Sequence, residues 1–384
     1  MIQSLIVWNE YIHDKDYEMS NESGVKSQPY FDLNTTNIVK GIAIILMFIH
    51  HFFTFPLWWG EGISLPTMER IAPYINFPTR LCVSIFCFIT GYFYSYKSIK
   101  SYKYSLKKIT DVLISYLTVF FIIALIAVMF GHYSYSSTEF IYECFALYQP
   151  TMVFCWYVNF YMIFMLVLPL ISRVMNKSVF VDLLLSLIIL PMILMQFVGI
   201  SGNELAKIAF MNFVIWLPMV LMGYIFEHYK LFQGLDKLLG KLAKPNIWAG
   251  ILWVIVMLIV PMGRYFEPSI TISFSNLPKC VITMDVLYTP LFIYSIVNIC
   301  RSLKIAPVKK VLYQIGKYSS IMWFVSCIFF NICEPIFKPV LYAPKIPILI
   351  LMWGLILCYV PAIGLDIVIK KIQGVKNRIF FASK

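Results

Sequence analysis

The stretch NIVKGIAIILMFIHHFFTFPLWW, residues 37–59, joins a long apolar run to three ionisable residues, Lys40, His50 and His51. A helix of about 20 apolar residues crosses the roughly 30 Å of bilayer hydrocarbon. The stretch therefore predicts a transmembrane helix. Its polar residues pose the question of why two adjacent histidines lie where water is scarce.

The composition of the whole chain excludes a soluble protein. Of its 384 residues, 60% are hydrophobic and 13% are charged, and the mean hydropathy is +0.79. Soluble domains carry about 25% charged residues. The sequence predicts an all-α, polytopic membrane protein with about ten spans, at 38–56, 77–96, 110–130, 153–172, 178–199, 209–226, 246–263, 281–300, 318–334 and 346–369.

The positive charges predict the orientation of these spans. Of the 31 lysines and arginines, 24 fall in the arm, the tail and one alternate set of connections. The other connections hold only Arg70, Arg80, Lys207, Arg264, Lys279, Lys338 and Lys345. Basic residues favour the cytosolic side, so we expect a multi-pass cell-membrane protein with both termini in the cytosol. The net charge of +12 is then explained by topology and membrane lipid, and no nucleic-acid partner is expected.

The segments outside the spans are short. We expect a cytosolic arm at 1–37, a transmembrane domain at 38–370 and a short basic tail at 371–384. The arm is too acidic and lacks the apolar core of a cleavable signal peptide. The nine cysteines show no metal-ligand spacing, so no metal site is predicted. A homo-oligomer is compatible with the sequence.

The histidines and the lysine of the first span form a pattern. Ionisable groups inside spans are costly and usually functional. At about 100° per residue, eleven steps place Lys40 and His51 on one face, about 16 Å apart along the axis, whereas His50 points about 80° away from Lys40. A neutral imidazole can take a proton from a hydroxyl, and a lysine can hold phosphate. The pattern favours group transfer from a phosphate-bearing donor to an alcohol.

Other polar residues allow two interpretations each. Arg80, at the outer start of the second span, either reaches the interface or acts inside the protein, as a charge partner or as a substrate clamp. Arg264 and Glu267 lie on an outer connection, where they either contact sugar hydroxyls or are exposed loop charges. Asp285, early in the eighth span, needs a partner or a proton. The aromatic residues of the outer connections fit either an interfacial belt or a platform for carbohydrate.

Several motifs resemble the acyltransferase 3 family, multipass membrane enzymes that O-acylate bacterial surface polysaccharides and related acceptors. The family's first span has a basic residue, ten residues and a histidine, as in Lys40 to His51. The matching segments are RLCVSIFCFITGYFYSY (80–96), the basic KSIKSYKYSLKKI (97–109), FCWYVNFYMIFMLVLPLI (154–171) and IGKYSSIMWFVSCIFF (315–330). The resemblance extends over nearly the whole chain, roughly 32–370. The family's usual arginine is Lys40 here, which loses the bidentate fork, and a histidine of many members is replaced by Ser326.

The resemblance implies an O-acyltransferase with acyl-CoA, most often acetyl-CoA, as co-substrate and no permanently bound cofactor. Lys40 and the basic stretch would meet the CoA phosphates, and ordinary positive-inside charge explains the stretch equally well. His51 would be the general base or a transient acyl carrier, with His50 a packing neighbour or second participant. The acceptor would be a hydroxyl of an outer glycan or a lipid-linked sugar. The lysines of the basic stretch are Lys103, Lys107 and Lys108.

A transporter or flippase for a small polar solute or a glycan is the alternative, because buried ions and ten spans suit it too. Against it, no pair of interrupted spans occupies matching positions in two halves, which would mark inverted repeats. A membrane scaffold would not explain ionisable residues inside spans. The Lys40–His51 register and the order of the motifs favour the enzyme.

Overall fold

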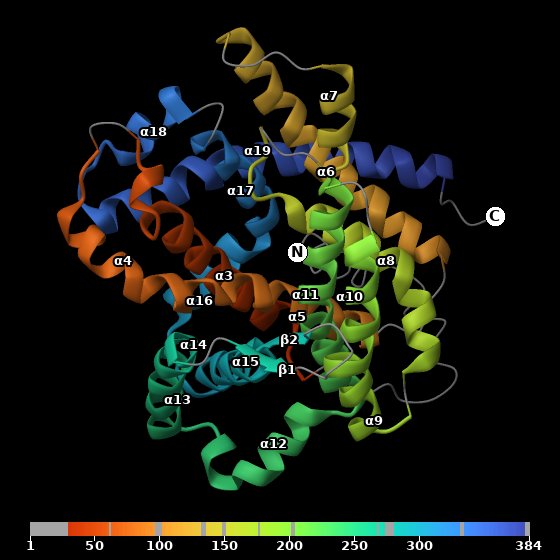
Figure 1. Ribbon diagram of the computed structural model, residues 1–384. Coiled ribbons are helices and arrows are strands. Elements are labelled where there is room, and N and C mark those ends of the chain that lie inside the picture. The colour runs from red at the N-terminus through yellow and green to blue at the C-terminus, as the bar shows by residue number, and fades with distance from the viewer. Residues whose placement is uncertain are drawn as a thin grey trace.

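The computed structural model describes residues 30–60, 63–96, 102–131, 136–147, 151–175, 177–200, 204–266, 269–272, 280–330 and 334–380. These residues are almost entirely helical, and they include one antiparallel hairpin of strands β1 (Ser269–Ile272) and β2 (Cys280–Thr283). Figure 1 shows the helices as one bundle with the hairpin beside α10 and α11. The all-α prediction is confirmed.

The helices of the first half run from the described start of the chain to the loop after α11. They are α3 (Leu33–Phe53), the short 3₁₀ helix η2 (Pro56–Trp58), α4 (Pro66–Thr79), α5 (Leu81–Tyr96), α6 (Tyr102–Met129), α7 (Ser137–Cys144), α8 (Trp156–Val174), α9 (Val179–Leu184), the π-helical turn η3 (Leu185–Ile189), α10 (Leu190–Ile200) and α11 (Glu204–His228).

The helices of the second half begin with a short helix after α11 and end with the longest helix of the described chain. They are α12 (Leu231–Leu239), η4 (Gly240–Ala243), α13 (Ile247–Ile259), η5 (Val260–Met262), α14 (Gly263–Phe266), α15 (Asp285–Ser302), α16 (Ala306–Lys317), α17 (Ser319–Ser326), η6 (Cys327–Phe329), α18 (Glu334–Tyr342) and α19 (Pro347–Phe380).

Eight of the ten predicted spans correspond to helices that are long and apolar enough to cross a membrane, counted over the described ranges. The predicted span at 281–300 is α15, whose 18 residues are less apolar and are buried on most sides by neighbouring helices. The predicted span at 318–334 corresponds to a bent pair of helices, Ser319–Phe329 and Glu334–Tyr342, which pass the length and hydropathy test together and lie at 111° to each other. Pro335 and Pro339 favour a separate short helix there.

Helix boundaries also differ from the prediction at both ends of the chain. α3 begins at Leu33, because the Asp32 carboxylate accepts a hydrogen bond from the Thr35 amide at 2.8 Å and caps the helix. At the other end, α19 continues through the predicted basic tail to Phe380. Its Lys376 contacts Asp111 of α6, so a tail lysine is part of the bundle.

Glycines allow the helices that carry the site to approach closely. A methyl group on Gly91 of α5 would lie 1.7 Å from the Val220 carbonyl oxygen of α11, and one on Gly223 would lie 2.0 Å from Phe88 O. On α3, a methyl on Gly41 would lie 2.1 Å from Leu312 O of α16. Small residues at such contacts let backbones pack in membranes. They fix α3 and α5 against α16 and α11, as Figure 1 also shows for α3 and α16.

The residues just before α3 are fixed by a polar cluster. The Tyr30 hydroxyl donates to Asp236 of α12 at 2.7 Å and accepts from Arg301 of α15 at 2.7 Å. Burial and the hydrogen bond to the Asp236 carboxylate raise the pKa of Tyr30, so the phenol stays protonated. The cluster ties the start of α3 to α12 and α15.

Candidate functional site

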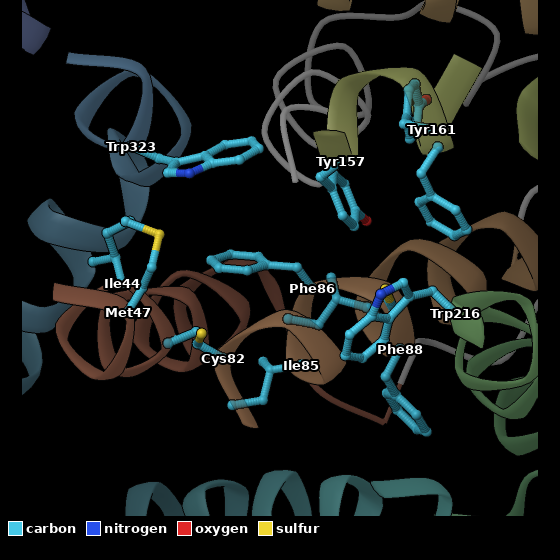
Figure 2. Close-up of a cluster of buried hydrophobic side chains, with 14 of the residues drawn as sticks. Ile44, Met47, Cys82, Ile85, Phe86, Phe88, Tyr157, Tyr161, Trp216 and Trp323 are labelled. Carbon is cyan, nitrogen blue, oxygen red and sulfur yellow. The ribbon is translucent and has the colours of Figure 1, made fainter. Parts of the chain in front are cut away.

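A cavity of about 210 Å³ lies beside the C-terminal end of α3. Its lining residues are Met47, His50, His51, Phe55, Trp58, Arg80, Cys82, Val83, Phe86, Phe154, Trp156, Tyr157, Trp216 and Trp323. Figure 2 shows how α3, α5, α8, α11 and α17 each contribute a side chain to this region. The walls are mainly aromatic. Among the described residues that line the cavity, three carry ionisable nitrogen groups, His50, His51 and Arg80, a composition typical of small-molecule sites.

His50 is held in one tautomer by its neighbours. Its Nδ1 lies 3.1 Å from the Thr79 hydroxyl oxygen. The Thr79 hydroxyl donates its hydrogen to the Ile75 carbonyl at 2.7 Å, and the Thr54 hydroxyl donates to the His50 carbonyl at 2.6 Å. With both hydroxyl hydrogens donated to carbonyls, we assign Nδ1 as the donor toward Thr79. The other ring nitrogen, Nε2, therefore carries the lone pair and can accept a proton.

His51 has different surroundings. Its ring stacks on Phe154 with centroids 4.2 Å apart and lies 5.2 Å from the His50 ring. Its Nδ1 is buried without a hydrogen-bond partner among the described residues. Phe154 has a φ of +72°, a left-handed conformation that costs a bulky residue about 1–3 kcal/mol. Backbone strain of this kind often marks functional sites.

Arg80 lines the same cavity from the junction of α4 and α5. It is the C-cap residue of α4, and it is exposed. Within the described ranges its guanidinium forms no hydrogen bond or ion pair, and it interacts with Asp285 only over a longer distance. The structure thus brings three of the predicted residues, His50, His51 and Arg80, to one cavity.

Arg264 and Asp285 form a buried ion pair. Arg264 Nε lies 2.6 Å from Asp285 Oδ1, and Arg264 also donates to the Phe77 carbonyl oxygen. The Ser84 hydroxyl donates to the second oxygen of Asp285. The partner that Asp285 was expected to need is therefore Arg264. The pair joins α14, α15 and α5, and neither residue lines the cavity. The predicted Glu267 lies outside the described residues.

Lys40 is fully buried in the N-terminal half of α3. Its ammonium donates to the Asn37 side-chain oxygen at 3.3 Å, and no carboxylate lies within ion-pair distance among the described residues. α3 is unbroken from Leu33 to Phe53, so the predicted register of Lys40 and His51 on one helix holds. A buried charge without a counter-ion costs several kcal/mol, and such costs are usually retained for function.

The three lysines predicted to bind the donor differ in burial. They occupy the first two turns of α6, where Lys103 is exposed, Lys107 is half-buried and Lys108 is fully buried. Lys108 Nζ lies 4.0 Å from Asp111 Oδ2 and 5.6 Å from the centre of the Tyr104 ring. None of the three lines the cavity. The predicted basic loop is thus partly a helix, and Lys108 belongs to the interior of the bundle.

Two residues that shape the site carry no local signal in the sequence. Thr79, which contacts the His50 ring, lies 29 residues away from it in the chain. Phe154 belongs to an apolar segment in which nothing distinguishes it from its neighbours. Ser326, which replaces the family histidine, donates to the Trp323 carbonyl at 2.7 Å and does not line the cavity. In the part of the chain that the structure describes, no three His, Cys, Asp or Glu side chains gather in a group that could hold a metal.

A comparison with protein families gives one result for the chain. The family model of the acyltransferase 3 domain, described as an acyltransferase domain, matches residues 34–367. The matched range starts at the second residue of α3 and ends within α19, so it contains the cavity, the histidine pair and Lys40. No curated protein and no solved structure gives a significant match.

Proposed function

Because this chain belongs to the acyltransferase 3 family of membrane acyltransferases, we propose that it O-acylates a glycan on the outer side of the cell membrane. The donor is acyl-CoA from the cytosol, with acetyl-CoA the simplest case. The acceptor is a hydroxyl group of an extracytoplasmic or lipid-linked sugar. Both termini lie in the cytosol in this proposal, as the distribution of basic residues indicates.

The observation that carries the proposal is the fixed imidazole of His50 at the cavity. Its Nδ1–H points to Thr79, so Nε2 is free to take the proton of an acceptor hydroxyl. An unprotonated nitrogen of His51 first attacks the carbonyl carbon of the thioester, and the carbon–sulfur bond breaks to release the CoA thiolate. The hydroxyl oxygen then attacks the acyl carbon on His51, and the carbon–nitrogen bond breaks while His50 takes the hydroxyl proton. The proton passes from the His50 imidazolium to the released CoA thiolate. This balances the reaction without a further co-reactant.

The two histidines take separate roles in this mechanism. The Lys40–His51 register favours His51 as base or transient acyl carrier, whereas the hydrogen bonds favour His50 as the base. We assign the proton transfer to His50 and the acyl-carrying role to His51. His51 lacks an orienting partner on Nδ1 but is held by stacking on Phe154. Replacement of His51 by alanine should still abolish transfer while membrane insertion persists.

Lys40 is the proposed ligand for a CoA phosphate. Its full burial without a carboxylate partner in the described part of the chain supports this role, because an anionic group would offset the cost of burying its charge. The exposed Lys103 offers a second positive charge near the start of α6. Lys108 contributes less, since it already contacts Asp111.

Donor binding tests the proposal directly. Purified protein in detergent is titrated with acetyl-CoA in a calorimeter, with Lys40→Ala and His51→Ala measured in parallel. We expect binding by the wild type, loss of binding in Lys40→Ala and retained binding in His51→Ala. A folded wild type that binds neither acetyl-CoA nor another acyl-CoA would contradict the proposal and favour a transporter.

A further inference from the structure

Two arginines near the cavity differ in how their charges are satisfied. Arg264 is paired with Asp285 at 2.6 Å, and the second oxygen of Asp285 accepts from Ser84. Asp285 also interacts electrostatically with Arg80, so a single carboxylate faces two guanidinium groups. Among the described residues Arg80 has no hydrogen-bond or ion-pair partner, although it lines the cavity with the two histidines. The cavity thus keeps one uncompensated positive charge.

The guanidinium of Arg80, which has no close counter-ion beside the aromatic walls, favours an anionic ligand over a neutral one. Guanidinium groups present planar pairs of donors that match carboxylate and phosphate oxygens. In a region of low dielectric, a hydrogen bond between charged partners is stronger than in water. A neutral sugar hydroxyl would use the donors but leave the charge uncompensated, whereas an anionic group would satisfy both.

The aromatic residues beside Arg80 supply a flat surface next to the charge. Phe55 stacks on Trp58 at 4.1 Å, Trp58 stacks on Phe154 at 5.3 Å, and Phe154 stacks on His51 at 4.2 Å. All four rings line the cavity, and the Trp58 side chain is only half-buried. This column ends at a histidine of the proposed reaction centre. A sugar ring that stacks on it would have its hydroxyl groups next to the histidines.

We propose that the acceptor is an anionic sugar, one bearing a carboxylate or a phosphate, whose charged group binds Arg80. This inference rests on the proposed function and narrows its substrate class. Arg80 fixes the charged end of the acceptor, the column of Phe55, Trp58, Phe154 and His51 supports the ring, and a free hydroxyl faces His50. The volume of about 210 Å³ limits the enclosed part of the ligand to about one small ring or group.

Binding without any acyl donor tests this inference. The full chain is placed in nanodiscs of phosphatidylcholine and titrated by calorimetry with cellobiose and with cellobiouronic acid, which carries one carboxylate in place of a hydroxymethyl group. Glucose and glucose 6-phosphate form the phosphate arm. We expect at least one anionic sugar to bind about 10–100-fold more tightly than its neutral counterpart, as one charge-assisted hydrogen-bond pair predicts.

Variants assign that preference to Arg80. Arg80→Gln should remove it, Arg80→Lys should keep part of it, and Arg70→Gln should leave it unchanged, because Arg70 is exposed on α4 away from the cavity lining. Arg80→Gln should stay folded, since Asp285 keeps Arg264 and Ser84 as its close partners. Equal binding of anionic and neutral sugars, no binding of either, or a preference that survives Arg80→Gln would each overturn the inference.

Lipid competition separates a sugar from a membrane source of the anion. Nanodiscs containing phosphatidylglycerol should leave the preference for anionic sugars intact. Loss of the preference there would show that Arg80 binds a lipid headgroup, which would overturn the inference. If the protein acylated neutral cellobiose as fast as the anionic sugars, the inference of an anionic acceptor would fail but the proposed acyltransferase function would stand. If the protein bound anionic sugars selectively but transferred no acyl group from any acyl-CoA, the proposed acyltransferase function would fail instead.

Discussion

Arg264 and Lys40 are both buried cations, yet their surroundings are opposite. Arg264 is clamped by Asp285 at 2.6 Å and by the Phe77 carbonyl. Lys40 is fully buried with one amide oxygen at 3.3 Å and no carboxylate among the described residues. A buried charge with a partner can serve to hold helices together, whereas a buried charge without one adds only cost to folding. We infer that Arg264 stabilises the packing of the helices and that Lys40, like Arg80, binds a ligand.

Breaking the paired site should have the largest effect on stability. Arg264→Leu leaves Asp285 buried without its counter-ion, and we expect the free energy of unfolding to fall by about 3–5 kcal/mol. The double variant Arg264→Leu/Asp285→Leu removes both charges and should recover most of that loss. Unfolding of purified protein in bicelles measures both. A double variant as unstable as the single one would show that the ion pair is not the cause.

Replacing the unpaired Lys40 should change the free energy of unfolding in the opposite direction. Lys40→Met removes a buried charge and keeps the side-chain volume, so stability should be unchanged or rise by about 1–4 kcal/mol. Acetyl-CoA affinity should fall at least about tenfold, from the loss of a charged hydrogen bond. The matched control is Lys338→Met, because Lys338 is also buried but pairs with Glu334 at 2.7 Å. Lys338→Met should lower the free energy of unfolding. An equal decrease in Lys40→Met would show that the paired and the unpaired lysine contribute alike to stability.

The hydroxyl that orients His50 should affect catalysis more than folding. Thr79→Val keeps the shape of the side chain and removes the acceptor of the Nδ1–H bond, so kcat should fall about tenfold, equivalent to one lost hydrogen bond. Thr79→Ser keeps the hydroxyl and should retain the wild-type kcat. The KM for the acyl donor should not change in either variant. The pH profile should shift only in Thr79→Val. His51, Arg80, Arg264 and Asp285, the other titratable groups around His50, stay in place. An unchanged kcat in Thr79→Val would remove the base role from His50.

An exposed ion pair should give the smallest effect. Lys370 pairs with Asp366 at 2.7 Å on α19, with 45% of the lysine side chain accessible. Such pairs contribute less than about 1 kcal/mol. Lys370→Met should therefore lower the free energy of unfolding by less than that amount in the same bicelle assay. A loss as large as that of Arg264→Leu would mean that burial does not decide the value of these pairs.

Local patterns in the sequence predicted much of the fold. Eight of the ten predicted spans match apolar helices, because span length is set by bilayer thickness and each apolar run can be recognised without its neighbours. The placement of Lys40 and His51 on one helix followed from helix periodicity. The bend after Phe329 and the burial of α15 were missed, since both depend on which helices surround those segments.

The contacts that define the site are long-range, and they could not be predicted. Thr79 reaches His50 across 29 residues, Arg264 meets Asp285 from a different helix, and Phe154 reaches His51 from the segment before α8. Each depends on how helices pack, which periodicity does not encode. The need of Asp285 for a partner was predictable from the cost of a buried carboxylate, although the identity of that partner was not.

The most direct test of the account is acyl transfer itself, measured in proteoliposomes with radiolabelled acetyl-CoA on the side of the termini and an anionic disaccharide on the other. The account predicts that the wild type labels the sugar, that His50→Gln and His51→Gln reduce the rate at least about 100-fold, and that both variants still bind acetyl-CoA. Labelling at the wild-type rate in both histidine variants would contradict a reaction at this cavity.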